Sequence, residues 1–189
     1  MSTLVVALGN PGNEYLNNRH NIGRLILEHL PFFSSLGWQK KFNGFFSQTN
    51  VSGEKVYFLM PETYMNLSGK SVAAAAKFFK VEVQDILVIH DELDLDYGVM
   101  SFKNGGGLAG HNGLKSIKEC LGSQDFLRLR LGIGRPSRGD VASWVLSDFK
   151  GEEADFLGNF LGEAAKGLEY FFDNGPKKSM NEYNTRKLI

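Results

Sequence analysis

The chain has 189 residues, which is enough for one domain with a full core and short for two. Hydrophobic residues make up 42%, charged residues make up 22% and the net charge is zero, which excludes disordered and fibrous classes. No apolar run approaches the length of a membrane span, and the first residues lack the charged start and apolar core of a signal peptide. We therefore expect residues 1–189 to form a single cytoplasmic domain that makes no membrane contact.

Short apolar segments alternate with amphipathic ones along the chain. In chain order, the patterns predict a strand at 4–8, a helix at 21–30, strands at 43–49 and 55–60, a helix at 66–79, strands at 86–90 and 99–103, a helix at 112–121, a strand at 126–133 and a long helix at 152–172. The polar tail at 177–189 has room for a short helix. This order predicts an α/β fold, a single domain with a mixed, mainly parallel twisted sheet flanked by helices.

A histidine and an aspartate follow two of the predicted buried strands. His20 comes after the first strand and its turn, and Asp91 directly follows the strand at 86–90. Because sites in parallel sheets form where strands end, Asp91 is placed to hydrogen-bond one imidazole nitrogen and leave the other as a base. His20 fits equally well as a cap for the helix at 21–30, and spacing alone does not separate the two interpretations.

Asparagines stand beside glycines at three predicted loop or loop–helix positions, Asn10, Asn66 and Asn112. An amide donates and accepts without charge, so a pocket lined by several can grip a carbonyl and stabilise an oxyanion. Each asparagine alone is better explained as a turn or helix-cap residue. Their common placement favours the pocket only modestly.

Positive charge is concentrated between residues 101 and 138, where seven Lys and Arg residues accompany two acidic ones. On a neutral protein, such a cluster can form an anion-binding face. Charge alone fits an ordinary solvated surface better.

Cofactor motifs are few. The glycine-rich loop (residues 105–110) is either a lid over a cleft or a plain connection, and it lacks the features of a dinucleotide or Walker A site. His20, His90, Asp91 and His111 offer metal ligands, but their spacing matches no metal motif. We expect no nucleotide cofactor and no metal, with a metal-dependent hydrolase as the weaker alternative.

A covalent nucleophile is not indicated either. The single cysteine, Cys120, lies in the amphipathic helix predicted at 112–121, where we expect it to pack as a small apolar side chain. No G-x-S-x-G sequence is present, which favours an activated water as the attacking group.

Six motifs occur along the chain: GNPGNEY at 9–15, RHNIG at 19–23, P-x-T-Y-M-N-L-S-G at 61–69, HDELDL at 90–95, GGGLAGHNGL at 105–114 and RLRLGIGRP at 128–136. In this order and spacing they resemble the bacterial-type peptidyl-tRNA hydrolase family over nearly the full chain. The resemblance implies cleavage of the ester that joins a peptide to the terminal ribose of tRNA, by a monomer that needs no metal and no obligate protein partner. An RNA-binding module that kept the scaffold and lost catalysis is the alternative.

The resemblance also implies roles for individual residues. It makes His20 the catalytic base, Asp91 the residue that keeps it basic, and Asn10 a catalytic-site residue that tells blocked from free α-amino groups. The substrate-binding positions are Tyr15, Tyr64, Asn66 and Asn112, and the tRNA-binding positions are Lys103 and Arg130.

On this basis a reaction sequence can be written. His20 takes a proton from water, Asp91 stabilises the imidazolium, and the water attacks the ester carbonyl. Asn66 donates to the oxyanion, while Asn10 and Asn112 hold the peptide backbone. The basic segment meets tRNA phosphates.

Overall fold

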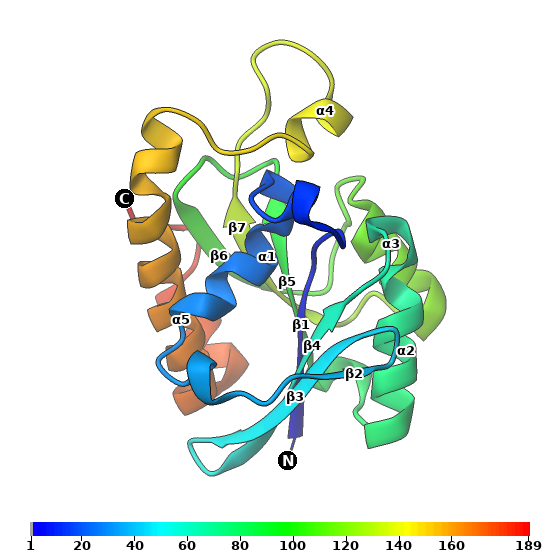
Figure 1. Ribbon diagram of the computed structural model, residues 1–189. Coiled ribbons are helices and arrows are strands. Elements are labelled where there is room, and N and C mark those ends of the chain that lie inside the picture. Colours follow the sequence, from blue (N-terminus) through cyan, green and yellow to red (C-terminus); the bar gives the residue numbers. More distant parts are fainter. Residues whose placement is uncertain (1) are drawn as a thin grey trace.

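The strands form one twisted sheet that is parallel at its centre and antiparallel at both edges. The computed structural model describes residues 2–189, and within them the strand order is β2-β3-β4-β1-β5-β7-β6-β8 (Figure 1). The strands are β1 (Ser2–Ala7), β2 (Gln39–Lys41), β3 (Gly44–Val51), β4 (Glu54–Pro61), β5 (Ile86–Glu92), β6 (Val99–Asn104), β7 (Leu127–Gly132) and β8 (Arg186–Lys187). Strands β4, β1, β5 and β7 run parallel, and each outer strand is antiparallel to its inner neighbour.

Helices cover both faces of the sheet. They are α1 (Ile22–Leu25), α2 (Ser68–Phe79), α3 (Asn112–Leu121), α4 (Val141–Val145) and α5 (Glu152–Glu182). Helices α1 and α5 lie on one face and α2 and α3 on the other, while α4 lies beyond the upper edge of the sheet (Figure 1). The predicted single α/β domain with a mixed sheet is confirmed.

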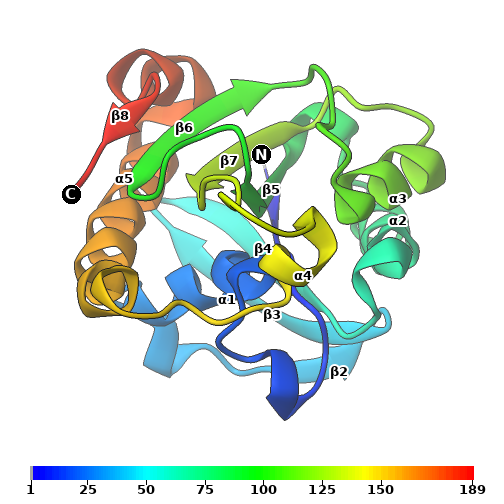
Figure 2. The ribbon, with the colours of Figure 1, turned by 90° about the horizontal axis from the view of Figure 1, so that it is seen from above.

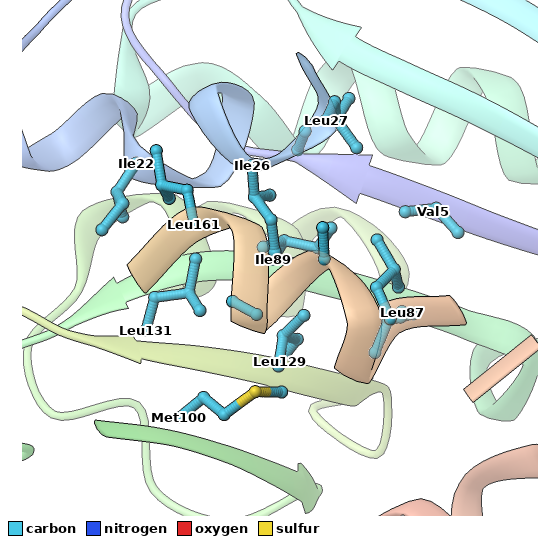
Figure 3. Packing of buried hydrophobic residues seen from close by; sticks show 14 of the residues in the cluster. Val5, Ile22, Ile26, Leu27, Leu87, Ile89, Met100, Leu129, Leu131 and Leu161 are labelled. Carbon is cyan, nitrogen blue, oxygen red and sulfur yellow. The ribbon is translucent and has the colours of Figure 1, made fainter. Parts of the chain in front are cut away.

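Alternation along each central strand divides the apolar side chains between two cores. In β1, Val5 belongs to the core under α1 and α5, whereas Leu4 and Val6 belong to the core under α2 and α3. Figure 3 shows the first core, with Leu161 of α5 among side chains from β5 and β7. Residues 4–7 of β1 and residues 86–89 of β5 are buried on both faces and wholly apolar, whereas β7 alternates leucine with arginine.

Two predicted helices differ from the observed ones. The segment 21–30 forms only the short α1, followed by a 3₁₀ turn at Ile26–His29. Helix α5 extends ten residues beyond the predicted end at 172, to Glu182, and is broken at Gly175, where φ is 82°. Pro176 then starts the second part, since proline fits a first helical turn and glycine tolerates positive φ.

The prediction for Cys120 was wrong, because its side chain is exposed. Helix α3 buries Gly113, Leu114 and Ile117 against the sheet, and Leu121 packs against the edge of that core. The helix ends at the next residue, so the last inward position goes to Leu121, and Cys120 is exposed with its sulfur beside Gly69 of α2.

The carboxyl ends of the parallel strands lie together at one end of the sheet, which we call its carboxyl edge. The segments that follow β1, β5 and β7 all start there, and α4 lies over this edge when the molecule is viewed from above (Figure 2). Among the described helices, none has both the length and the hydropathy that crossing a membrane requires.

Candidate active site

His20 and Asp91 are in direct contact although 71 positions separate them. His20 lies in a 3₁₀ turn, Arg19–Asn21, after β1, and Asp91 lies near the end of β5. Because β1 and β5 are parallel neighbours, both residues reach the same edge of the sheet. The Nδ1 atom of His20 lies 2.9 Å from each carboxylate oxygen. A carboxylate only accepts, so Nδ1 carries the proton and Nε2 keeps its lone pair.

Arg19, the first residue of the turn that carries His20, anchors this turn to the segment that follows α4. Its buried guanidinium donates to Ser147 Oγ and forms an ion pair with Glu153 at 2.9 Å. It also lies over the Trp144 ring, 3.6 Å from the ring centroid. Planar stacking and forked hydrogen bonds suit arginine. His20 itself does not cap α1, whose first turn has no side-chain cap, so the cap interpretation was wrong.

His111 is a second partner of the same carboxylate. Its Nε2 atom lies 2.9 Å from Asp91 Oδ1, and its Nδ1 atom accepts from the backbone N–H groups of Gly113 and Leu114 at the start of α3. Nε2 therefore carries the proton and donates to Asp91. Sequence reasoning treated His111 only as a weak metal ligand. The available signal was its place at the helix start, one residue before Asn112.

The donor set of these three residues bears on metal binding. One ligand atom from each of His20, Asp91 and His111 lies within 4.8 Å of the others. However, a histidine whose Nδ1 accepts hydrogen bonds holds its proton on Nε2, so His111 has no lone pair free for an ion there. The hydrogen bonding thus favours a proton network over a metal site.

Burial and neighbouring charges shift the pKa of both Asp91 and His20. Burial opposes ionisation of Asp91, but the charges and hydrogen bonds of His20 and His111 outweigh it and hold the pKa of this carboxyl far below its usual range. Burial also lowers the pKa of His20, and the Asp91 carboxylate more than offsets this, so that the pKa of His20 is raised. His20 is therefore a stronger base than a free imidazole.

His90 lies behind this network and stays neutral. Burial, with the neighbouring His111, lowers the pKa of His90 to about 3. Its Nδ1–H donates to the backbone oxygen of Asp91 at 2.8 Å, and its ring packs edge-on against His111. The residue supports the strand end and the second histidine without adding charge.

A cavity of about 290 Å³ opens beside the pair. The lining comes from the turn that carries His20, the end of β5, the start of α3 with the loop before it, and α4. The residues are His20, Asp91, Glu92, Leu93, Gly110, His111, Asn112, Val141, Ala142 and Val145. Sequence reasoning missed the apolar wall from α4. The available signal was Asp140, whose side chain accepts from Ser143 N and caps this short helix.

The predicted asparagines occupy different environments. Asn112 lines the cavity, although His111 rather than Asn112 caps α3. Asn10 is buried, and its Oδ1 accepts from Met65 N at 2.8 Å. That bond orients the Asn10 amide and leaves its Nδ2 donors without a partner among the described residues. Asn66 is exposed and does not cap α2.

The two predicted tyrosines do not line the cavity. Tyr64 lies on the loop between β4 and α2 and is 60% exposed. Tyr15 is half-buried in a 3₁₀ turn, Asn13–Tyr15, in the segment between β1 and α1. Both segments follow strands that end at the same edge of the sheet as β5.

The predicted basic residues share one face of the sheet. Register pairs Ser101 with Arg130 and Lys103 with Arg128, so all four side chains lie on the face opposite α5. Arg130 donates to Ser101 Oγ at 2.9 Å and lies 3.6 Å from Glu92 Oε1. Arg128 is buried, so we call the two partly exposed residues, Lys103 and Arg130, the basic face.

A histidine oriented by a buried aspartate, where parallel strands end, is an arrangement that suits a hydrolase with a general base. The sequence pattern of the peptidyl-tRNA hydrolase family matches residues 4–189. The peptidyl-tRNA hydrolase of Citrifermentans bemidjiense is 45% identical over 184 residues, covering 97% of this chain and 98% of its own. That of Geotalea daltonii is 44% identical over 187 residues, covering 98% of each chain.

Solved structures agree with the sequence comparison. The crystal structure of peptidyl-tRNA hydrolase from Acinetobacter baumannii matches with a TM-score of 0.90 and 36% identity, covering 99% of this chain and 96% of that one. The chain belongs to the peptidyl-tRNA hydrolase family.

Proposed function

We propose that this protein hydrolyses the ester bond between the peptide and the terminal ribose of peptidyl-tRNA, and so returns tRNA to translation. Membership of the peptidyl-tRNA hydrolase family supports the reaction. One observation carries the chemistry: His20 binds Asp91 through Nδ1 and lines the cavity, so that its Nε2 is free to act as a base.

The reaction needs only water and the side chains of this site. His20 Nε2 takes a proton from water while Asp91 stabilises the imidazolium, and the water oxygen bonds to the ester carbonyl carbon. When the tetrahedral intermediate collapses, the bond to the ribose oxygen breaks and the imidazolium returns the proton to that oxygen. A positioned base contributes about 10²–10⁴-fold, and each oxyanion donor contributes about 10²–10³-fold. An ester needs less acceleration than an amide.

Asn10 and Asn112 are the amides we propose to hold the peptide beside the ester. Asn112 lines the cavity, and Asn10 presents a fixed amide whose donors have no protein partner. Amides bind peptide groups without reading side chains, which suits a substrate of any sequence. We propose that Asn66, which follows the Met65 that Asn10 binds, donates to the oxyanion. We propose that Tyr15 and Tyr64, outside the cavity lining, contact more distant parts of the substrate.

The basic face is the part of the molecule that we propose to contact tRNA. Lys103 and Arg130 would meet phosphates, which position a nucleic acid rather than specify its sequence. We further propose that the protein acts in the cytoplasm as a monomer, without a metal, a nucleotide cofactor or an obligate protein partner.

The test is release of free tRNA from N-acetyl-aminoacyl-tRNA by the purified protein. We expect His20→Ala to lower kcat roughly 10²–10⁴-fold while native circular dichroism and tRNA binding persist. Near-normal turnover by folded His20→Ala would rule out the proposed base. Tight tRNA binding by the wild-type protein without ester cleavage would instead favour the catalytically silent RNA-binding module.

A further inference from the structure

One buried arginine holds the glycine-rich loop. Arg128, on β7, is 1% exposed. Its Nη1 donates to the carbonyl oxygen of Gly107 at 2.7 Å, and its Nη2 donates to those of Gly105 and Gly106. Three consecutive backbone carbonyls thus converge on a single guanidinium, whose forked donors fit such an arrangement.

Burial of the charged Arg128 side chain lowers the stability of the fold unless other contacts compensate. Within residues 2–189 no carboxylate forms an ion pair with it, since the nearby Glu92 pairs with Arg130. A buried cation without a countercharge destabilises a protein unless hydrogen bonds compensate, and an apolar side chain would fill a core position more favourably. The loop carbonyls supply this compensation, together with the Phe126 ring, whose centroid lies 5.5 Å from the guanidinium carbon.

The loop leads directly to the catalytic network. After Gly107, only three residues precede His111, and the backbone N–H of His111 donates to Leu108 O at 2.9 Å to close that turn. The loop also touches the basic face, because a Cβ atom on Gly106 would lie 2.6 Å from Lys103 Cε. The segment 105–107 therefore lies between Arg128 and Lys103, just before His111.

We propose that Arg128 is a positioning residue, which fixes residues 105–107 and thereby places His111 against Asp91. The proposal rests on the proposed hydrolase function for its consequence in turnover. When the loop is released, His111 loses its fixed approach to Asp91. The carboxylate then has one donor fewer, and His20 is less firmly oriented.

The main variant is Arg128→Met, which removes the charge and every donor while keeping an unbranched side chain. We expect kcat on N-acetyl-aminoacyl-tRNA to fall roughly 10–100-fold, with KM within about threefold of wild type. Because Asp91 loses a hydrogen-bond donor, its charge acts more strongly on His20, and the acid limb of the kcat profile should move to higher pH.

A readout without substrate separates this proposal from the proposed function. In the free protein, amide hydrogen exchange over residues 105–111 should be faster in Arg128→Met than in wild type, and the ring NMR signals of His20 should titrate at higher pH. The matched control is Arg186→Met, which removes an exposed arginine on the opposite face at β8 and should leave kcat and loop exchange unchanged.

Arg128→Lys keeps the charge and can still donate, so its kcat and loop exchange should lie between those of wild type and Arg128→Met. If Arg128→Met does not fold, Arg128→Lys decides the question: slower turnover with faster loop exchange supports the proposal. Turnover within twofold of wild type with unchanged loop exchange, in whichever of the two variants folds, would overturn it. If the wild-type protein shows no hydrolysis, the exchange and titration measurements still test Arg128.

Discussion

Among single residues, Asp91 organises the site because two histidines donate to it through different ring nitrogens. His20 donates through Nδ1, while His111 donates through Nε2 because its Nδ1 is occupied by backbone N–H groups. The two imidazoles therefore have opposite tautomers, and only His20 has a free nitrogen for water.

The raised pKa of His20 predicts a pH dependence. If His20 is the proposed base, it acts when neutral, so kcat/KM should rise with pH through a value above 6.5, the ordinary pKa of histidine. In Asp91→Asn the carboxylate is lost and burial remains, so this limb should move to lower pH while the plateau falls roughly 10²–10⁴-fold. Rate profiles from pH 5 to 9 would measure both, and an unmoved limb would contradict the ion pair.

Asn10 allows a second prediction at this scale. Asn10→Asp retains an oxygen that accepts from Met65 N but loses the Nδ2 donors, so the fold should persist while turnover falls roughly 10–100-fold. Asn10→Ala also leaves the Met65 N–H unsatisfied, and we expect it to lower the free energy of unfolding by about 1–3 kcal/mol. Urea denaturation and turnover, measured together, distinguish the two losses. Equal stability of Asn10→Ala and wild type would contradict the role of the Met65 bond.

At the scale of elements, the longer strands were predictable, whereas the contacts between them were not. Strands buried on both faces are continuous apolar runs, which any window of sequence reveals. The elements that escaped prediction, β2, β8 and α4, are only a few residues long and depend on their neighbours. The His20–Asp91 contact needed β1 and β5 to be adjacent, and the His111 contact needed α3 to start beside β5; neither is a property of a local window.

The approach of α1 to β5 depends on one glycine. A Cβ atom on Gly23 would lie 2.4 Å from the backbone oxygen of Ile89. Gly23→Ala should push the helix away from the strand, lower the free energy of unfolding by about 1–3 kcal/mol, and slow turnover by displacing His20.

The matched control is Gly158→Ala in α5, where an added Cβ meets nothing within 4 Å. This substitution should stabilise the protein by about 0.5–1 kcal/mol. Chemical denaturation of both variants tests the pair of predictions, and similar stability changes would show that the helix–strand approach does not require glycine.

At the scale of the whole molecule, zero net charge conceals an uneven distribution. Lys103 and Arg130 share the sheet face opposite α5, so the molecule offers an anion a preferred side despite its balanced composition. The excess of positive residues was readable in the sequence. Their common face required the register of β6 against β7.

The salt dependence of tRNA binding tests whether the basic face contacts tRNA. Lys103→Ala and Arg130→Ala should each reduce the slope of log affinity against log salt by about one. Arg130→Ala should lower tRNA affinity more than Lys103→Ala does, because it also leaves the negative charge of Glu92 without its ion-pair partner. Lys166→Ala, on exposed α5, is the control and should leave the slope unchanged. Slopes identical to wild type in both Lys103→Ala and Arg130→Ala would remove the basic face from the tRNA contacts.

The central place of β1 in the sheet has a consequence for how the chain is made. Strand β1 is synthesised before both of its partners, β4 and β5, and the second partner is complete only at Glu92. At roughly 5–20 residues per second, a strand with two apolar faces waits about 4–20 seconds for its neighbours. Such non-local pairing makes folding slow. We therefore expect a substitution that weakens the apolar part of β5 to reduce soluble yield before it reduces activity.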